Sequence, residues 1–220
     1  MLKFKGHSNQ NTTGINCHAE LVSASKNRTT LNPEFSGVRV FLWVLFLYLL
    51  LLTTKYNAME MNLISPVVAA FTTLLVGFVW YHPKVFGTAW MKETGLTQEE
   101  LAKGNMLKIF GLTFIFSIFI AMVMQSLAIH QMGAMGMIGG PTKLAEAKPS
   151  FAAFMADYGT AFRTAKHGAL HGTLTGLFFA FPMIAINGLF ERKSWKYIFI
   201  HAGYWVISLM IIGAIVCAWV

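Results

Sequence analysis

Long apolar blocks alternate with short polar stretches from residue 61 to the C-terminus. Four blocks are long enough to cross a bilayer as helices, at about residues 63–81, 106–129, 168–190 and 197–220. Such a span needs about 20 mostly apolar residues, because a helix rises about 1.5 Å per residue through a hydrocarbon core about 30 Å thick. The pattern predicts an all-α, polytopic transmembrane four-helix bundle that forms one domain over residues 61–220.

Shorter signals lie between and within these blocks. Thr97, followed three residues later by Glu100, is the signature of a capping box at a helix start. In the long loop before the third block, Ser150 is a candidate N-cap for a helix that lies on the membrane surface or on top of the bundle. Pro182 predicts a kink in the third block, because its ring removes one N–H from the helical ladder.

Residues 1–60 do not follow the pattern of the core. Residues 1–38 are polar and rich in Ser, Thr and Asn, which is typical of disorder. The segment from His18 to Ser25 resembles the translation of a repeated intergenic element of bacterial genomes, so we interpret residues 1–60 as an extension outside the folded domain. The short apolar run within residues 40–54 leaves a second interpretation open, an extra N-terminal hydrophobic helix.

The composition excludes an ordinary soluble domain. Of the 220 residues, 55% are hydrophobic and 12% are charged, whereas soluble domains have about 25% charged residues. The net charge of +8 comes from loops and from the N-terminal extension, and no basic patch alternates with aromatic residues. We therefore expect the lipid bilayer as a partner and no nucleic acid.

The loop lysines and arginines predict an orientation. The first and third loops of the core contain seven of them: Lys84, Lys92, Lys103, Lys108, Arg192, Lys193 and Lys196. The long second loop contains four: Lys143, Lys148, Arg163 and Lys166. Because the more basic loops remain in the cytoplasm, the first and third loops are predicted to be cytoplasmic in a multi-pass protein of the bacterial inner membrane.

Small residues recur every four positions on the third block, at Gly168, Gly172, Gly176 and Ala180. Such a stripe lines one helix face and lets another backbone approach closely, which drives helix packing in lipid. The partner helix can belong to the same chain or to a second copy. A homo-oligomer formed through the stripe is therefore one of two open alternatives.

Three histidines are candidate metal ligands at the outer face. His167 and His171 are four residues apart and share one helix face, and His130 ends the second block on the same side. Met132, Met135 and Met137 follow His130. Imidazole suits zinc, copper and haem iron, and thioethers suit Cu(I). The other interpretation, which we favour from the sequence, needs no cofactor: the histidines form hydrogen bonds with loops or water, and the methionines pack.

A second polar group lies toward the opposite face. It consists of His82, Asn187, His201 and Tyr204, which the predicted topology places at similar depth. Polar groups in a bilayer need partners. We expect these side chains to form a hydrogen-bonded network that joins helix ends.

Several short motifs resemble those of the DUF1761 family. They are Trp80-Tyr81-His82-Pro83, Phe86-Gly87, Trp90-Met91, Gly95-Leu96-Thr97, His167-Gly168, Asn187 through Glu191-Arg192, and Gly203-Tyr204 through Trp219. The resemblance covers residues 61–220. It implies a bacterial membrane protein with four helices and implies no activity.

The functional prediction is correspondingly broad. No Asp or Glu lies inside a predicted span, which argues against an exporter that exchanges protons at an intramembrane carboxylate. No nucleophile–base pair indicates a hydrolase or transferase, so we predict no catalytic residues. We expect a non-enzymatic membrane module, either a small-solute carrier or channel or a partner protein. The alternative is a protein that binds a metal ion or haem through its outer histidines.

Overall fold

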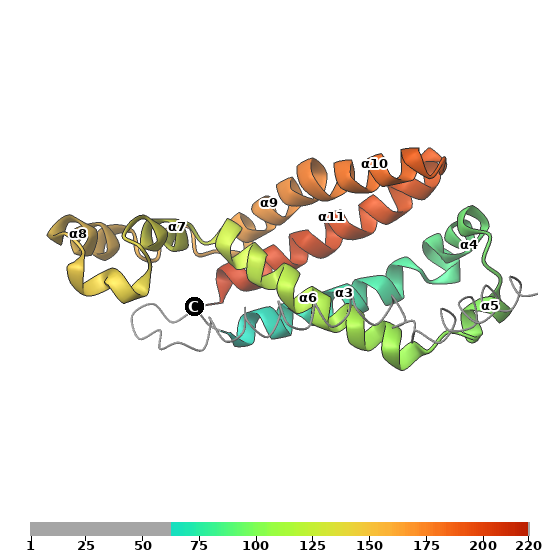
Figure 1. Ribbon diagram of the computed structural model, residues 1–220, viewed down its shortest axis with the longest axis horizontal. Helices are drawn as coiled ribbons and strands as arrows, with labels where there is room; N and C mark the ends of the chain where they lie inside the picture. Colours follow the sequence, from blue (N-terminus) through green and yellow to red (C-terminus); the bar gives the residue numbers. More distant parts are fainter. Residues whose placement is uncertain (1–62, 220) are drawn as a thin grey trace, which may run out of the picture. The chain divides into compact units, whose positions relative to one another are not determined.

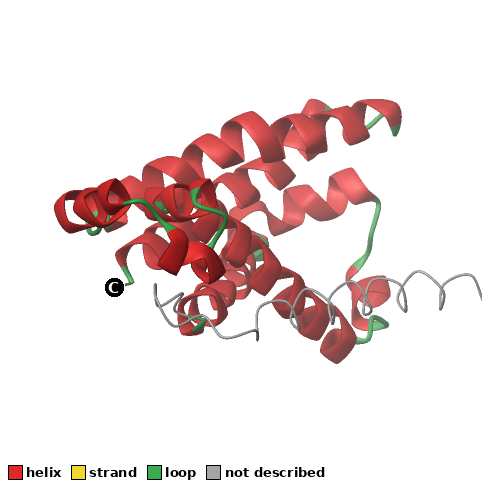
Figure 2. Ribbon diagram, turned by 60° about the vertical axis from the view of Figure 1, so that its left-hand side comes forward, coloured by secondary structure: helices red, strands yellow, loops and turns green. Residues whose placement is uncertain are grey.

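A computed structural model describes residues 63–219 of the chain. Internal contacts divide the chain into residues 1–55 and residues 56–220, and the described residues all belong to the second unit. The sequence predictions for residues 1–60 lie outside the described part. Within it, the chain is helical and contains no strand, which confirms the all-α class (Figure 2).

Helices of very different length follow one another along the chain. They are α3 (Ile64–Trp80), η1 (Pro83–Gly87), α4 (Thr88–Thr94), α5 (Gln98–Ala102), α6 (Met106–Ala128), α7 (His130–Met137), η2 (Pro141–Glu146), α8 (Pro149–Tyr158), α9 (Ala165–Thr175), η3 (Gly176–Ala180), α10 (Phe181–Phe190) and α11 (Trp195–Ala218). The long helices agree with the predicted spans within a few residues.

Three helices are long and apolar enough to cross a membrane: α6, the continuous helix Ala165–Phe190, and α11. A fourth span exists if α3 and the segment Pro83–Thr94 count as one, although they are bent by 55°. Pro83 accounts for the break, because its ring lacks an N–H and disfavours helix in the residue before it. His82 accordingly has an extended backbone, with ψ of 139°.

The exposed surface of the long helices is apolar. Phe78 of α3, Leu107 of α6 and Phe178 of η3 are 80%, 87% and 76% exposed. A surface of this kind is costly in water and is the expected one against lipid chains. Together with the long apolar helices, it indicates a protein that contacts the bilayer.

Two local predictions have opposite outcomes. The capping box is confirmed, because the Glu100 amide donates to Thr97 Oγ1 at 3.2 Å and the Thr97 amide donates to Glu100 Oε2 at 2.8 Å. The N-cap role of Ser150 is wrong, because α8 begins at Pro149 and Lys148 is the N-cap. Proline suits the first helical position, where its missing N–H would have no partner in any case.

Pro182 is accommodated by a π-helical turn. The turn, η3, comes immediately before the proline, and the Phe181 amide donates to the Gly176 carbonyl five residues earlier. The wider turn absorbs the irregularity that the proline ring imposes on the preceding carbonyls. The helix therefore continues to Phe190 instead of ending at the proline.

Helix α11 lies at the centre of the packing and contacts α9, α10, α3 and α6 (Figure 1). Ile212 and Val216 of α11 are fully buried. They belong to one apolar cluster with Ala69 of α3 and Met124 of α6. Burial of such side chains contributes roughly 1.5–3 kcal/mol each in water, and in lipid the same contacts stabilise through close packing.

The small-residue stripe faces α11 of the same chain. A Cβ at Gly168 would overlap the carbonyl oxygen of Gly213, and one at Gly172 would overlap that of Leu209. At Gly176 a Cβ would lie 2.7 Å from the Cα of Val206. The stripe is therefore covered within the chain, so the expectation that a second copy packs on it does not fit this arrangement.

Buried hydroxyl and amide groups join α3 to α6. Gln125 Nε2 donates to Ser65 Oγ at 2.7 Å, and the hydroxyls of Thr73 and Ser117 are 2.6 Å apart. Hydrogen bonds of this kind between membrane helices each contribute on average about 0.6 kcal/mol. They also fix the register of the two helices, because each of these hydrogen bonds forms only when the two residues lie at the same level along the helix axes.

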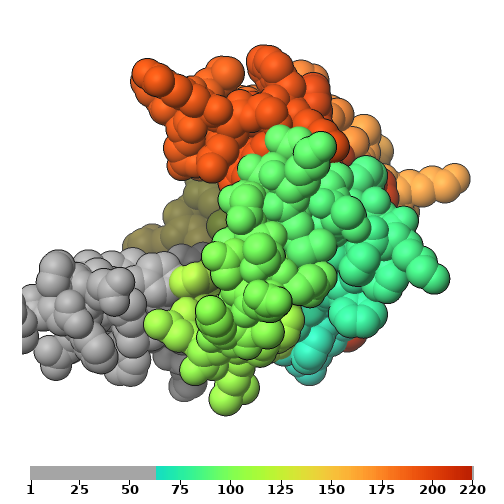
Figure 3. All heavy atoms as spheres, turned by 90° about the vertical axis from the view of Figure 1, so that its right-hand side faces the viewer, coloured from blue at the N-terminus to red at the C-terminus, as the bar shows by residue number. Residues whose placement is uncertain are grey.

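Side-chain contacts tie the loops together at each end of the helices. At one end, Ser194 donates to Glu93, and Lys196 lies 3.9 Å from the same carboxylate, so the first and third loops meet (Figure 3). At the other end, Arg163 donates to the carbonyl of Cys217 in the last turn of α11 and to that of Trp219, the C-cap of this helix. A cation is favourable there, because carbonyls at a helix C-terminus lack intrahelical partners.

Candidate metal centre

The structure brings the three predicted outer histidines together. His130 is the first residue of α7, and His167 and His171 lie on α9. His130 Nε2 and His167 Nε2 are 2.8 Å apart. One ring nitrogen from each histidine lies within 4.8 Å of those of the other two.

Local structure explains why these rings converge. The chain is extended at Ile129, between the end of α6 and His130, and this break turns α7 away from the axis of α6. On the other segment, Thr164 caps α9 by accepting a hydrogen bond from the His167 amide at 3.2 Å. The cap fixes the first turn of α9, and the four-residue spacing places His171 one turn further along the same face.

Gln131 holds the loop that returns to α9. It is buried, and its Nε2 donates to the carbonyls of Tyr158 and Ala161 at 2.8 and 2.9 Å. Sequence reasoning missed this residue, because nothing near it in the chain indicates a contact about 30 residues away. Its effect is to fix the distance between the start of α7 and the start of α9, and so between His130 and the other two rings.

Phe162 covers one side of the cluster. Its ring centroid is 5.1 Å from that of His167 and 6.0 Å from that of His130. The residue has a φ of 61°, a left-handed conformation that costs a bulky side chain about 1–3 kcal/mol. Its carbonyl accepts from the Cys217 thiol, and Arg163 next to it is bound to the end of α11. These contacts hold the strained turn, and the sequence contains no local signal for it.

The spacing of the nitrogens suits a small ion. Zinc–nitrogen bonds of about 2.0–2.1 Å in a tetrahedron separate neighbouring nitrogens by about 3.3 Å. The observed separations, 2.8 Å for one pair and at most 4.8 Å for any pair, reach this value by small rotations of the rings. His130 is exposed and the other two histidines are partly buried, so the cluster is accessible from the surface.

The methionines that follow His130 differ in how far they are buried. Met135 is buried, whereas Met137 is 89% exposed and lines a separate cavity beyond α7. Met137 lies seven residues along the helix from His130, which is about 10 Å. Met137 is therefore too far along the helix to join the three imidazoles.

The four residues of the predicted inner network have different partners. His201 Nδ1 is 3.2 Å from the Tyr81 hydroxyl, and Tyr204 donates to the Thr73 carbonyl at 3.0 Å. His82 accepts from the Lys84 amide, and Asn187 lines a mostly apolar cavity. Among the described residues, no hydrogen bond joins these four side chains to one another. The centre of this region is Tyr81, which sequence reasoning left out.

Tyr81 lies within an aromatic group. Its ring centroid is 5.3 Å from that of Trp90, 5.5 Å from that of Tyr204 and 6.1 Å from that of His201. Aromatic pairs at these separations stabilise by about 0.5–1.5 kcal/mol each. This group joins α3, α4 and α11 where the first and third loops meet, and it gives His201 and Tyr204 a structural role.

A comparison with family models finds one match, to the family described as Protein of unknown function (DUF1761), over residues 64–217. The matched segment includes the three outer histidines, α3, α6, the helix Ala165–Phe190, and α11 except for its last residue. Neither the curated proteins nor the solved structures contain a match to this chain.

Proposed function

Because the chain belongs to the DUF1761 family, whose function is unknown, we propose a function from its own side chains: an integral membrane protein that binds a divalent transition-metal ion, Zn²⁺ or Cu²⁺. The ligands are His130, His167 and His171. One observation carries this proposal. Ring nitrogens of the three histidines lie within 4.8 Å of one another, although His130 and His167 are 37 residues apart in the chain.

The contact within the cluster is compatible with a bound cation. An ion between His130 Nε2 and His167 Nε2, which are 2.8 Å apart, would accept a lone pair from each ring in place of the hydrogen bond that now joins them. Neutral imidazole is the usual ligand of zinc and copper, and three of them with one open position form a familiar coordination set.

The same geometry favours a bare ion over haem. A porphyrin occupies the plane around its iron, so the protein supplies axial ligands above and below that plane. His167 and His171 share one helix face, so they approach from the same side and cannot be the two axial ligands of one porphyrin, and the cluster has one imidazole more than an axial pair needs. Purified protein is accordingly expected to have no haem absorption.

The proposed membrane setting has four spans, and the bundle over residues 61–220 is one domain. In the first span α3 crosses the bilayer, and the segment Pro83–Thr94, bent by 55° from it, leads into the first loop. The contact between Glu93 and Ser194 supports it, since the first and third loops must then share a side. The loop charges favour the cytoplasm for these loops in a bacterial inner membrane. The histidines would then face the outside.

A labelling experiment tests this orientation. In a chain without Cys17 and Cys217, single cysteines at Lys92 and Lys148 are treated with a membrane-impermeant maleimide on intact cells. We expect labelling at position 148 and none at position 92 until the membrane is opened. Labelling of position 92 alone on intact cells would reverse the orientation.

Metal analysis tests the proposed site. Purified protein is stripped with a chelator, titrated with Zn²⁺ or Cu²⁺, and measured by calorimetry and elemental analysis. We expect one ion per chain in the wild type. The variant His167→Ala/His171→Ala should lose at least a hundredfold in affinity, because one imidazole cannot hold the ion alone.

The matched control is His82→Ala/His201→Ala, which removes two histidines from the other end of the helices. It should bind the ion as the wild type does. A wild type that binds no ion, or a control that loses as much affinity as the test variant, would contradict the proposal. The role of a small-solute carrier, channel or partner protein stays a prediction.

A further inference from the structure

The segment between α6 and α9 forms an open hollow, which is separate from the histidines. We call residues 130–158, which comprise α7, η2 and α8, the hood. The hood lies beyond the ends of α6, α9 and α11 (Figure 1). Between its three helices is a hollow of about 870 Å³, which is within the range of about 300–1,000 Å³ that small-molecule sites occupy.

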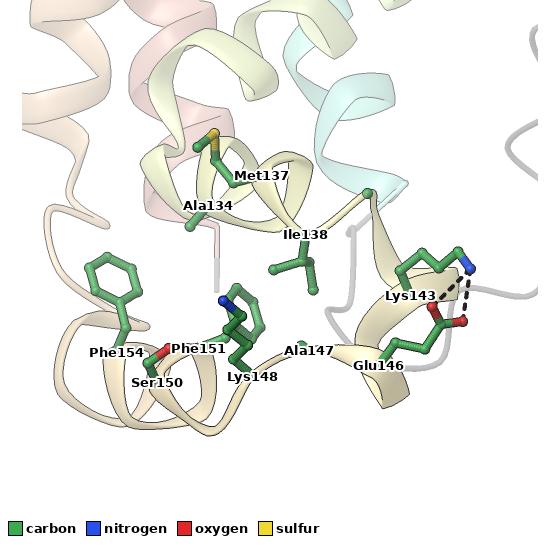
Figure 4. A pocket seen from close by; sticks show the side chains of 11 residues that line it. Ala134, Met137, Ile138, Lys143, Glu146, Ala147, Lys148, Ser150, Phe151 and Phe154 are labelled. Atoms are coloured by element: carbon green, nitrogen blue, oxygen red, sulfur yellow. Dashed lines mark hydrogen bonds and ion pairs between the residues drawn. The ribbon is translucent and has the colours of Figure 1, made fainter.

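The wall of the hollow is mostly apolar. Its apolar lining comes mainly from Met137, Ile138, Phe151 and Phe154, with Ala134 on the α7 side (Figure 4). Met137 is 89% exposed and Phe154 is 45% exposed. Apolar side chains left open in this way favour an apolar occupant over water.

One cation in the wall has no acidic partner. Of the two lysines that line the hollow, Lys143 forms an ion pair with Glu146 at 2.8 Å. Lys148 has no carboxylate within ion-pair distance among the described residues, and Figure 4 shows its side chain extending from the start of α8 toward α7, beside Phe151. The hollow therefore combines an apolar wall with a single free positive charge.

The position of the hood identifies the source of a ligand. Helix α6 ends at Ala128 immediately before it, and α9 begins at Ala165 soon after it, so two apolar helices leave the membrane there. Tyr158 and Phe162, which follow the hollow in sequence, are 54% and 66% exposed. Exposed aromatic rings beside basic residues at the ends of spans are typical of segments that lie at the lipid headgroups.

We propose that the hood binds an anionic phospholipid of the leaflet beside it. The phosphate contacts Lys148, and the glycerol and upper acyl carbons lie against Phe151, Phe154 and Met137. Charge complementarity carries the choice of ligand, because a zwitterionic lipid would bring its own cation next to Lys148. This site is independent of the proposed metal centre, since none of the three histidines lines the hollow.

Native mass spectrometry of the chelator-treated full chain in detergent tests the site, with phosphatidylglycerol and phosphatidylcholine as probes. We expect one phosphatidylglycerol to bind more tightly than phosphatidylcholine. Lys148→Gln should weaken its binding about tenfold, as for the loss of a charge-assisted hydrogen bond. Ala134→Trp, which keeps every charge and fills the hollow, should weaken the binding of both lipids.

Lys84→Gln is the matched control, because it removes an exposed lysine at the other end of the helices. Circular dichroism and thermal unfolding show whether each variant is folded. An equal loss in Lys84→Gln and Lys148→Gln would show that surface charge alone attracts the lipid and would overturn the proposal. Full binding by folded Ala134→Trp, or complete displacement by inorganic phosphate, would also overturn it.

Discussion

Gly172→Ala is expected to destabilise the protein by about 3 kcal/mol or more, although it adds one methyl group. The new Cβ would overlap the carbonyl oxygen of Leu209 and would lie 2.8 Å from the Cα of Met210. Both are backbone atoms in the middle of α11, so no side-chain rotation relieves the overlap. The two helices must move apart along the whole stripe, and contacts on either side of it are lost.

The control for this prediction is another helical glycine. Gly111 lies in α6, and a Cβ there would meet no atom within 4 Å. Gly111→Ala should therefore leave the stability unchanged or raise it by up to about 1 kcal/mol, since alanine is the better helix former. Reversible unfolding in mixed micelles measures both variants. Equal stability of the two would show that α9 and α11 do not pack as the structure has them.

The main helices could be predicted because hydrophobic length and small-residue spacing are local properties of the chain. The stripe at Gly168 and Gly172 predicted a close helix contact, but it could not identify α11 as the partner. That choice depends on Gly213 and Leu209, which meet the stripe through tertiary packing. The bend after Trp80 and the π-helical turn before Pro182 also depend on how the chain balances lost hydrogen bonds against packing, so the proline positions alone did not determine them.

The candidate site shows the same division. The spacing of His167 and His171 follows from helix geometry, and the topology placed His130 at the same end. The sequence did not reveal Gln131 or Phe162, because Gln131 contacts carbonyls 27 and 30 residues away and the Phe162 carbonyl accepts from Cys217, 55 residues away. The expected inner network failed for a related reason: Tyr81 lies between the helix ends and forms the hydrogen bond to His201 at 3.2 Å that we had assigned to the other polar residues.

The two proposals place distinct chemistry at one end of the molecule. The hood and one of the three histidines, His130, belong to the segment between α6 and α9, whereas His167 and His171 lie on α9. Gln131 binds the loop that follows α8, and Arg163 binds the end of α11. A bound lipid would contact the far end of α7, whereas a metal ion would hold its first residue. Loss of either ligand is therefore expected to leave the other site intact, which is why each can be measured with the other emptied.

The affinity for the metal ion is expected to fall steeply as the solution becomes acidic. A histidine binds a metal ion only in its neutral form, so protons compete with the ion for His130, His167 and His171. At alkaline pH the affinity should vary little. In acid, each ligand that carries a proton in the free protein must release it, and each such proton makes the apparent affinity fall by up to about tenfold per pH unit. Competition with a chelator of known pH dependence measures this slope.

The slope counts the protons that the ion displaces, which makes the prediction sharper than a loss of binding alone. His130→Ala removes one ligand, so its slope in acid should be shallower than that of the wild type and its affinity at neutral pH weaker. His201→Ala, at the other end of the helices, should keep the slope of the wild type. A wild-type affinity that does not change with pH, or a slope that His130→Ala leaves unchanged, would contradict the three-histidine centre.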